Sequence, residues 1–404
     1  MKVAFLTRFD PHLRSSWSGT LFSMFRALGR CCETVTALGP AAEGWWFAGR
    51  VVRRLTRVIL RKNIDYTHTV ALSRILARTF ARRLAQTSDI DLIFAPVAST
   101  EIAFLNTELP IVLYGDLTNK LFVNYAAHLT HLSPWSIAQL ELVEGTALRR
   151  ANHIVYASEW AARSAVHDCE VPQEKISVVP MGANLDEVPT REQVSAARGR
   201  GRKDECRLVF AGVDWERKGG DIALAAMRRL RERGVNATLT VIGCIPPGAL
   251  EPNIRVIPFL DKSLPQHQKQ FTQILLESDF MLFPTRREAY GIVCCEANAH
   301  GLPVIASDGG GVPVRNGENG ILLPASASDI DYADAVQGLL NDPARYLQLV
   351  RDGRQAFETR LNWDAWAKSM RLVFERVIQE RAAQALVPGP VRAQNTVECK
   401  GKVL

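Results

Sequence analysis

Short apolar runs alternate with longer amphipathic stretches along most of this 404-residue chain. In the first half, each apolar run is followed by small or polar residues; the runs lie at residues 3–7, 92–95, 111–114, 153–157 and 176–179. Residues 20–28, after the first run, have the spacing of a helix. Such alternation predicts parallel strands joined by helices, which is an α/β doubly wound sheet.

The alternation restarts after a polar stretch at residues 190–206. Further strands are predicted at residues 208–211, 237–242, 279–283 and 303–306, with a helix at 221–233. Near the end, Trp366, Met370, Val373 and Val377 repeat at helical spacing and predict an amphipathic helix. We therefore expect two Rossmann-like domains, because a single core rarely grows beyond about 250–300 residues.

Composition agrees with a large enzyme that folds in the cytoplasm. Hydrophobic residues make up 47% of the chain, yet no run of about 18 apolar residues predicts a membrane span. Arg8 and Asp10 interrupt the apolar N-terminal run, which favours a strand over a signal peptide. The cysteines include two adjacent pairs and no C-x-x-C spacing, so reduced thiols are expected.

The most informative polar residues lie between two predicted strands of the second half. A buried strand leads to a turn with Glu288, Gly291 opens a helix that carries Glu296, and the next strand ends in three glycines. Ligands of parallel sheets bind beyond the carboxyl ends of the strands. The amides of Ile292 and Val293 would be free to bind phosphate. Carboxylates beside such amides suit polyhydroxyl ligands, and we predict a nucleotide-sugar site.

This segment resembles the signature of retaining glycosyltransferase family four (glycosyl transferases group one) in Glu288, Gly291, Glu296, Ala297, Gly301, Pro303 and Val304. The resemblance implies a GT-B fold, in which two Rossmann-like domains face a central cleft. It also implies that Glu288 contacts the donor sugar and that Glu296 holds the ribose hydroxyls of the nucleotide.

Domain boundaries follow from the resemblance and the pattern together. Residues 1–184 are expected to form an acceptor-binding domain, 185–206 a linker, and 207–362 a domain that binds the nucleotide-sugar donor. The C-terminal helix at about 363–382 is expected to cross back to the first domain. Residues 384–404 contain Pro388, Gly389 and Pro390 and are expected to be disordered.

The resemblance places Lys218, together with Arg217, on the donor diphosphate. Negative charge develops on this leaving group, so fixed cations there stabilise the transition state more than the ground state. Many family members have Arg where this chain has Val213. The remaining donor contacts that the resemblance implies are Gly19, Gly212, Phe259, Leu260, Tyr290 and the helix start at Ile292 and Val293.

On the acceptor side, Trp17 and Ser18 precede Gly19 in a turn between a strand and a helix. Asp116 follows a predicted strand, at a position where the family commonly has His. Asp116 is therefore expected among the catalytic residues with Glu288, Lys218 and Arg217, serving either donor or acceptor. A lone Asp in such a turn is also typical of a helix cap.

Two Asp-x-Asp strings, Asp89 to Asp91 and Asp329 to Asp331, match the pattern by which some glycosyltransferases bind a divalent metal ion. Matches of two residues arise by chance, and no His joins either string. We predict no metal and no other cofactor, with a nucleotide diphosphate sugar as co-substrate.

Charge indicates a second kind of partner. Residues 45–86 hold ten Lys or Arg and one acid within a chain of net charge +7. Arg50, Arg54, Arg57 and Arg61 share one face of a predicted helix. This face suits an anionic membrane surface, which would place the protein peripherally on the inner face of the membrane, or an acidic glycan or lipid-diphosphate acceptor. A solvated helix packing on the sheet remains the alternative. No nucleic-acid motif is present.

The sequence thus predicts a retaining glycosyltransferase that moves a sugar from a nucleotide diphosphate to a lipid-linked, glycan or small-molecule acceptor. Two alternatives stay open. A nucleotide-sugar epimerase shares the architecture but needs no acceptor, and a non-catalytic glycan- or nucleotide-binding protein would need only the fold. The pattern of Glu288, Glu296 and Lys218 favours the transferase.

Overall fold

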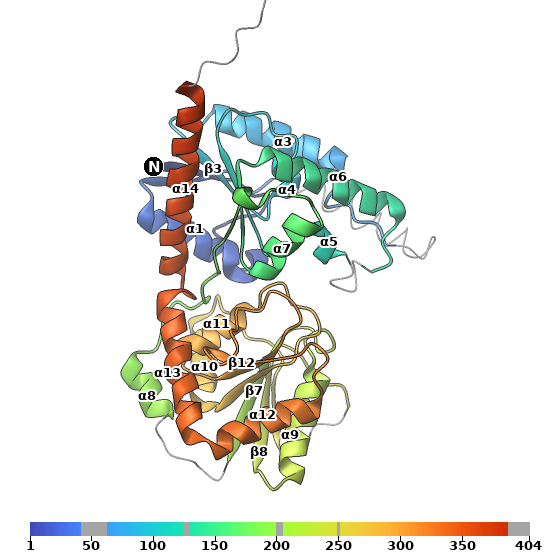
Figure 1. Ribbon diagram of the computed structural model, residues 1–404, viewed down its shortest axis with the longest axis vertical. Coiled ribbons are helices and arrows are strands. Elements are labelled where there is room, and N and C mark those ends of the chain that lie inside the picture. Colours follow the sequence, from blue (N-terminus) through green and yellow to red (C-terminus); the bar gives the residue numbers. More distant parts are fainter. Residues whose placement is uncertain (42–62, 124–129, 199–204, 249–250, 387–404) are drawn as a thin grey trace, which may run out of the picture.

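The computed structural model describes residues 1–41, 63–123, 130–198, 205–248 and 251–386. It shows two α/β units, one above the other in Figure 1, each built on a six-stranded parallel sheet. None of the described helices is long and apolar enough to cross a membrane. The basic stretch with Arg50, Arg54, Arg57 and Arg61 lies outside the described residues.

The first sheet has the strand order β2-β1-β3-β4-β5-β6. Its strands are β1 (Lys2–Phe5), β2 (Thr34–Ala37), β3 (Leu92–Pro96), β4 (Ile111–Gly115), β5 (His153–Tyr156) and β6 (Ile176–Val178). The helices of this half are α1 (Thr20–Cys31), α3 (Val70–Ala85), α4 (Ser99–Ile102), α5 (Asn119–Phe122), α6 (Pro134–Arg150) and α7 (Glu159–His167), with short 3-10 turns η1 (Ser16–Gly19) and η3 (Gln173–Lys175).

The second sheet has the order β12-β11-β10-β7-β8-β9. Its strands are β7 (Cys206–Ala211), β8 (Ala237–Ile242), β9 (Ile254–Ile257), β10 (Phe280–Phe283), β11 (Val304–Ser307) and β12 (Gly320–Leu323). Its helices are α8 (Arg191–Arg198), α9 (Gly220–Glu232), α10 (Pro265–Glu277), α11 (Ile292–Ala299), α12 (Asp329–Asn341) and α13 (Pro343–Thr359), and the long α14 (Trp363–Leu386) follows.

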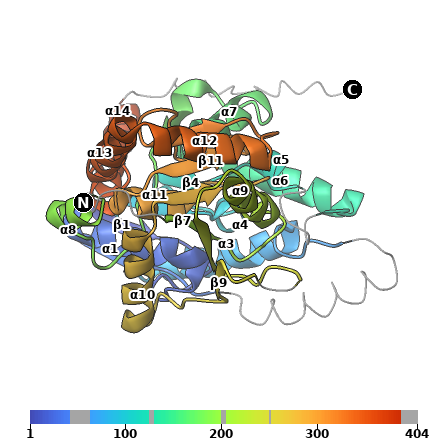
Figure 2. The ribbon, with the colours of Figure 1, turned by 90° about the horizontal axis from the view of Figure 1, so that it is seen from below.

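The predicted fold class is confirmed, since both sheets are parallel and have helices on their two faces (Figures 1 and 2). Every predicted strand is present, with ends shifted by at most one or two residues. Three strands, β2, β9 and β12, were not predicted. All three are edge strands, and most of their residues are only partly buried, in contrast to the strands in the middle of each sheet.

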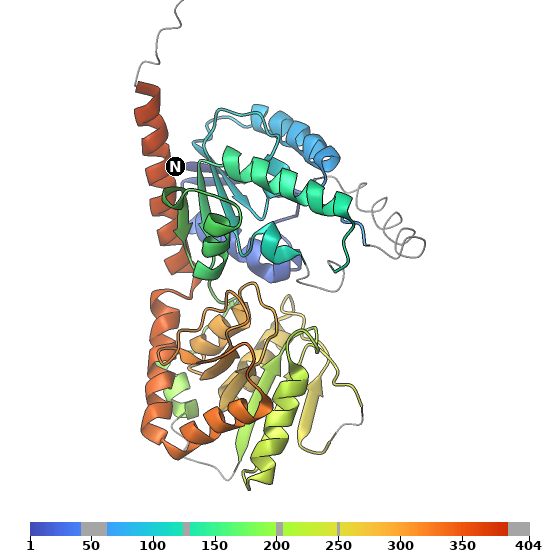
Figure 3. The same cartoon turned by 45° about the vertical axis from the view of Figure 1, so that its right-hand side comes forward.

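Helix α14 leaves the second unit and runs along the first (Figures 1 and 3). Its Trp366, Met370 and Phe374 are buried in a core that it shares with α1 and with β3 and β4. The Trp366 ring lies edge-on to Phe94 and Tyr114, at centroid distances of 5.9 and 5.8 Å. The amphipathic pattern read from the sequence is therefore the face that packs on the first domain.

The interval 185–206, which we expected to be a linker, contains helix α8. Val194 and Arg198 of this helix are buried against the second unit. The Arg198 guanidinium donates to the carbonyls of Ser278, Leu275 and His300 at the ends of α10 and α11. We expected a solvated stretch because these residues are polar and basic. An arginine that is buried and bonds to carbonyls at helix ends cannot be told from a solvated one by sequence alone.

Helix α14 continues as far as Leu386, so residues 384–386, which we expected to belong to a disordered tail, are helical. Residues 387–404 lie outside the described part of the chain.

Candidate functional site

The two units meet where the carboxyl ends of their strands face each other (Figure 3). The Tyr290 hydroxyl of the second unit donates to the carbonyl of Met181, which follows β6, at 2.8 Å. Gly311 lies so close to Ser158 that an added Cβ would be 2.4 Å from its hydroxyl oxygen. Turns after β10 and β11 therefore touch turns after β5 and β6, and the predicted site residues lie along this seam.

Glu288 and Lys218 form a buried ion pair in the second unit. Their side chains are 7% and 13% exposed, and the ammonium of Lys218 donates to Glu288 Oε2. The Lys218 ammonium also lies over the Phe283 ring, 5.1 Å from its centroid. The structure thus brings together two residues that are 70 positions apart in the sequence.

Glycines allow the two loops of this pair to approach. Gly219 has φ 71°, and a Cβ there would lie 1.9 Å from the carbonyl oxygen of Pro284. A Cβ added at Gly310 would likewise lie 1.9 Å from the carbonyl oxygen of Glu288. The backbone of Glu288 also accepts from Gly311 and donates to Gly309, both at 3.1 Å. Side chains at these glycines would displace the loops that carry Lys218 and Glu288.

Asp116, at the carboxyl end of β4, faces this pair from the first unit. The pKa of Asp116 is raised to about 7, chiefly by burial and in part by the charge of Glu288, against a hydrogen bond from its own backbone amide. A carboxyl group with this pKa can hold or release a proton near neutral pH. Asp116, Glu288 and Lys218 are thus brought together across the domain boundary.

Glu296 lies on α11 and is fully buried. Its Oε2 accepts from the ammonium of Lys262 at 2.6 Å. Burial raises the pKa of Glu296, while Lys262 and the backbone amide of Asn184 oppose this shift. Its second oxygen, Oε1, has no hydrogen-bond partner among the described residues. A buried acceptor without a partner is costly, so a hydrogen-bond donor that reached this oxygen would be favoured.

Lys262 was not predicted from the sequence. It lies in the turn after β9, two residues beyond Leu260, and its position there gave no signal that it would reach a carboxylate on another element. A basic residue in the turn after a strand was the hint that the sequence offered.

Helix α11 begins as predicted, at Ile292, directly after Gly291 with φ 78°. The amides of Ile292 and Val293 belong to its first turn, where helix geometry leaves N–H groups without intrahelical partners. Tyr290, in contrast, lies in the core shared by both units, with its hydroxyl committed to Met181. The structure therefore places Tyr290 in the domain interface.

The turn before α1 has an unusual backbone. Trp17, Ser18 and Gly19 have φ of 48°, 55° and 85°, three consecutive left-handed residues. Asn184 holds this turn: its amide donates to the Ser18 carbonyl at 2.9 Å, and it accepts from the Ser23 hydroxyl at 2.8 Å. Strain that neighbouring contacts hold in place is typical of functional turns.

The other predicted donor residues lie on turns of the second unit. Arg217 donates to Asp214 Oδ2 at 3.3 Å and to the Arg287 carbonyl at 3.0 Å. Gly212 packs against the aliphatic chain of Lys218, since a Cβ added at Gly212 would lie 2.9 Å from Lys218 Cγ. After β9, Phe259 is 63% exposed and Leu260 is buried.

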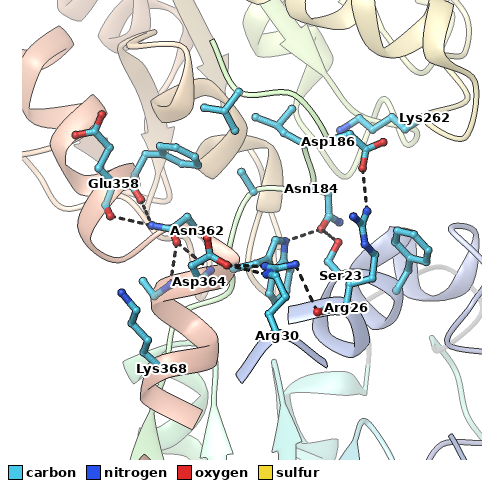
Figure 4. Close-up of a pocket in the computed structure, with 18 of the residues that line it drawn as sticks. Ser23, Arg26, Arg30, Asn184, Asp186, Lys262, Glu358, Asn362, Asp364 and Lys368 are labelled. Carbon is cyan, nitrogen blue, oxygen red and sulfur yellow. Dashed lines mark hydrogen bonds and ion pairs between the residues drawn. The ribbon is translucent and has the colours of Figure 1, made fainter. Parts of the chain in front are cut away.

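A cavity of about 810 Å³ extends the site toward the connection between the units (Figure 4). It lies between α1, residues 183–188, the turn after β9 and the start of α14. Asp186 accepts from Arg14 of the first unit at 2.8 Å and from Gln268 of the second at 2.6 Å. Gly19 and Lys262 line this cavity, so it adjoins the proposed nucleotide residues.

The two Asp-x-Asp strings serve local structure. Asp91 accepts from the Lys2 amide at 2.7 Å, and Asp331 accepts from the Ser328 amide in the capping box of α12. Among the residues that the structure describes, no group of three His, Cys, Asp or Glu is arranged to hold a metal ion. Independence from metal stays a prediction.

The family described as Glycosyl transferases group 1 matches residues 205–342. The D-inositol 3-phosphate glycosyltransferases of Rhodococcus jostii and Corynebacterium aurimucosum are 29% and 27% identical over 48% and 58% of the chain, covering 46% and 59% of their own length. The chain thus aligns with about half the length of these curated relatives.

Solved structures match over almost the whole chain. A sucrose-phosphate synthase from Thermosynechococcus elongatus is 17% identical with a TM-score of 0.66, over 94% of this chain and 99% of its own. HepE from Anabaena, solved with UDP, is 16% identical with a TM-score of 0.62, over 93% and 100%. At this identity the likeness shows the GT-B fold. Residues 205–342 thus match the group 1 glycosyltransferases, and the whole chain has the GT-B fold.

Proposed function

We propose that this protein is a retaining glycosyltransferase that uses a nucleotide diphosphate sugar. The observation that carries the proposal is the cluster of Asp116, Glu288 and Lys218 at the seam between the domains, with the unpartnered oxygen of Glu296 on the next helix. These groups supply a cation for a leaving diphosphate and buried carboxylates for sugar and ribose hydroxyls.

In the proposed reaction, the second domain holds the donor. Glu296 binds the ribose, Lys218 and the first amides of α11 bind the diphosphate, and Glu288 binds the sugar. As the glycosidic bond breaks, negative charge grows on the diphosphate, and Lys218 stabilises this charge more strongly than that of the bound donor. The acceptor approaches from the first domain beside Asp116. Retention follows if the leaving phosphate oxygen takes the acceptor proton on the same face of the sugar.

For the donor, a uridine nucleotide is the first candidate, because HepE of Anabaena was solved with UDP. For the acceptor, a phosphorylated polyol is the first small molecule to test, because the relatives are named for D-inositol 3-phosphate. A lipid-linked or glycan acceptor at an anionic membrane surface fits the basic segment with Arg50, Arg54, Arg57 and Arg61.

The test is an assay of UDP-, GDP- and ADP-sugars, with and without acceptors, that follows nucleotide release and sugar products. Release that depends on an acceptor, with a new glycoside of unchanged anomeric configuration, is the expected outcome. A changed donor sugar without any acceptor would favour the epimerase, and binding without turnover would favour the non-catalytic protein. An inverted product would refute the retaining mechanism.

A further inference from the structure

Glu296 is in an environment where a carboxylate is hard to keep ionised. The side chain is fully buried, and burial raises its pKa. A glutamate buried without a compensating charge can titrate as high as about 8–9 and is then neutral at physiological pH. A neutral carboxyl group is the weaker acceptor for sugar hydroxyls, because hydrogen bonds to ionised groups are stronger.

Lys262 is the cation that meets this carboxylate. Its ammonium lies 2.6 Å from Glu296 Oε2, and Oε1 has no hydrogen-bond partner in the described part of the chain. The remaining titratable neighbours on α11 carry no positive charge at neutral pH. Burial raises the pKa of the thiols of Cys294 and Cys295, and burial lowers the pKa of His300, whose Nδ1 is 2.7 Å from the Glu296 carbonyl, to about 4.

Lys262 is itself held in place from the opposite side. Its ammonium lies 4.2 Å from the centroid of the Phe271 ring on α10. Gln268, one turn earlier on α10, donates to the Lys262 carbonyl at 2.5 Å and to Asp186 Oδ2 at 2.6 Å. The side chain is 35% exposed and lines the cavity of Figure 4. Lys262 therefore bridges the cavity and the buried carboxylate.

We propose that Lys262 is a positioning residue for nucleotide binding: it keeps Glu296 ionised, occupies Oε2 and leaves Oε1 free for a ribose hydroxyl. This inference rests on the proposed function. Its consequence is that removing the charge of Lys262 should make nucleotide affinity depend more steeply on pH than in the wild type, because Glu296 then binds a proton more readily.

The experiment measures the affinity of UDP, GDP and ADP by calorimetry from about pH 5.5 to about pH 8.5, and compares variants with the wild type at each pH for the nucleotide that binds best. The ratio of the variant's dissociation constant to that of the wild type at the same pH does not depend on the titration of the nucleotide's own phosphate. Lys262→Met should weaken binding roughly tenfold at the acidic end, and the loss should shrink as pH rises, because Glu296 then ionises. Lys262→Arg should stay near the wild type throughout.

Lys368→Met is the matched control, since this exposed lysine lines the same cavity and is not paired with Glu296. Its ratio should be close to one at every pH. If Lys262→Met does not fold, Lys262→Gln replaces it, because an amide can still donate to Oε2 without supplying charge. A ratio for Lys262→Met or Lys262→Gln that does not change with pH would overturn the inference while leaving the proposed function intact. Absence of nucleotide binding by the wild type would overturn both.

Discussion

At the scale of single residues, the site consists of buried charges that hold one another in place. Lys218 pairs with Glu288 across two turns of the second domain, and Lys262, in the turn after β9, pairs with Glu296 on α11. In the unliganded protein these pairs satisfy charges that would otherwise be unpaired in a poorly solvated place. A donor has to share or replace them, so the roles of the partners in each pair can be separated by substitution.

Glu288→Ala and Lys218→Ala should differ in their effect on nucleotide diphosphate binding. Glu288 is assigned to the sugar, so its loss should lower turnover and change UDP affinity by about twofold or less. Loss of Lys218 should weaken UDP by roughly 1.5–3 kcal/mol, the range for a charged hydrogen bond.

Calorimetry with UDP and a turnover assay check this prediction. Glu288→Gln and Lys218→Met serve as controls of similar size. Equal losses of UDP affinity for both positions would contradict the assignment.

Asp116 should make stability depend on pH. Its pKa in the folded protein is raised to about 7, so the folded state keeps the proton while the unfolded chain has lost it. The contribution of Asp116 to stability is then fully present below about pH 4 and is lost progressively as pH rises to about 7.

The measurement is urea unfolding of the wild type and Asp116→Asn at several pH values. The stability of the wild type relative to the variant should fall between about pH 4 and pH 7 and level off above. Glu144, whose pKa burial also raises to about 7, is common to both proteins and cancels in the difference. A difference that is constant across this range would show that the surroundings of Asp116 do not raise its pKa.

At the scale of elements, the site depends on how closely strand-end turns approach. The turn after β7 lies on the turn after β10 at Gly219, and the turn after β11 lies on Glu288 at Gly310. The turn before α1 is held by Asn184, which also accepts from the indole of Trp363 at the start of α14 at 3.1 Å. The side chain of Asn184 thereby ties the turn before α1 to both the connection between the domains and the returning helix.

Gly219→Ala should be far more damaging than Gly234→Ala. Both glycines have positive φ, 71° and 85°, but a Cβ at 219 would lie 1.9 Å from the Pro284 carbonyl oxygen, whereas nothing lies within 4 Å of one at 234. Gly234→Ala should cost roughly 1–2 kcal/mol from backbone strain alone. Gly219→Ala should lower the free energy of unfolding by about 3 kcal/mol or more. It should also weaken UDP binding, because it displaces Lys218.

Thermal or urea unfolding, together with UDP titration, distinguishes these effects. Similar losses for both variants would show that the approach of the two turns is not tight.

At the scale of the whole molecule, the two domains are joined by more than the chain crossover. The buried core that contains Trp366 of α14 also contains Met181 and Tyr290, so it is continuous across the seam. Asp186 adds a polar link, since it accepts from Arg14 of the first domain and from Gln268 of the second. A relative movement of the domains would therefore change the shared core or the hydrogen bonds of Asp186 beside the cavity of Figure 4.

Membrane attachment is a prediction about the whole molecule that concerns residues outside the described part of the chain. If Arg50, Arg54, Arg57 and Arg61 face anionic lipid, each contributes roughly 1 kcal/mol. Replacing all four with Gln should abolish sedimentation with anionic vesicles, and added salt should do the same to the wild type.

Turnover with a small soluble acceptor should survive the replacement. A wild-type protein that ignores anionic vesicles at low salt would favour a soluble acceptor.

The sequence by itself determined the alternation of strands and helices, the two-domain fold and the positions of Glu288, Gly291 and Glu296, because local apolar runs and glycines at strand ends depend on neighbours in the chain. It did not determine which side chains meet. The pairs Lys218 with Glu288 and Lys262 with Glu296 join residues 70 and 34 positions apart. Only the tertiary structure, by the order in which parallel strands are placed in a sheet, brings such turns together. The same reason explains Tyr290, which the resemblance placed among the donor contacts and whose hydroxyl bonds to Met181 in the domain interface.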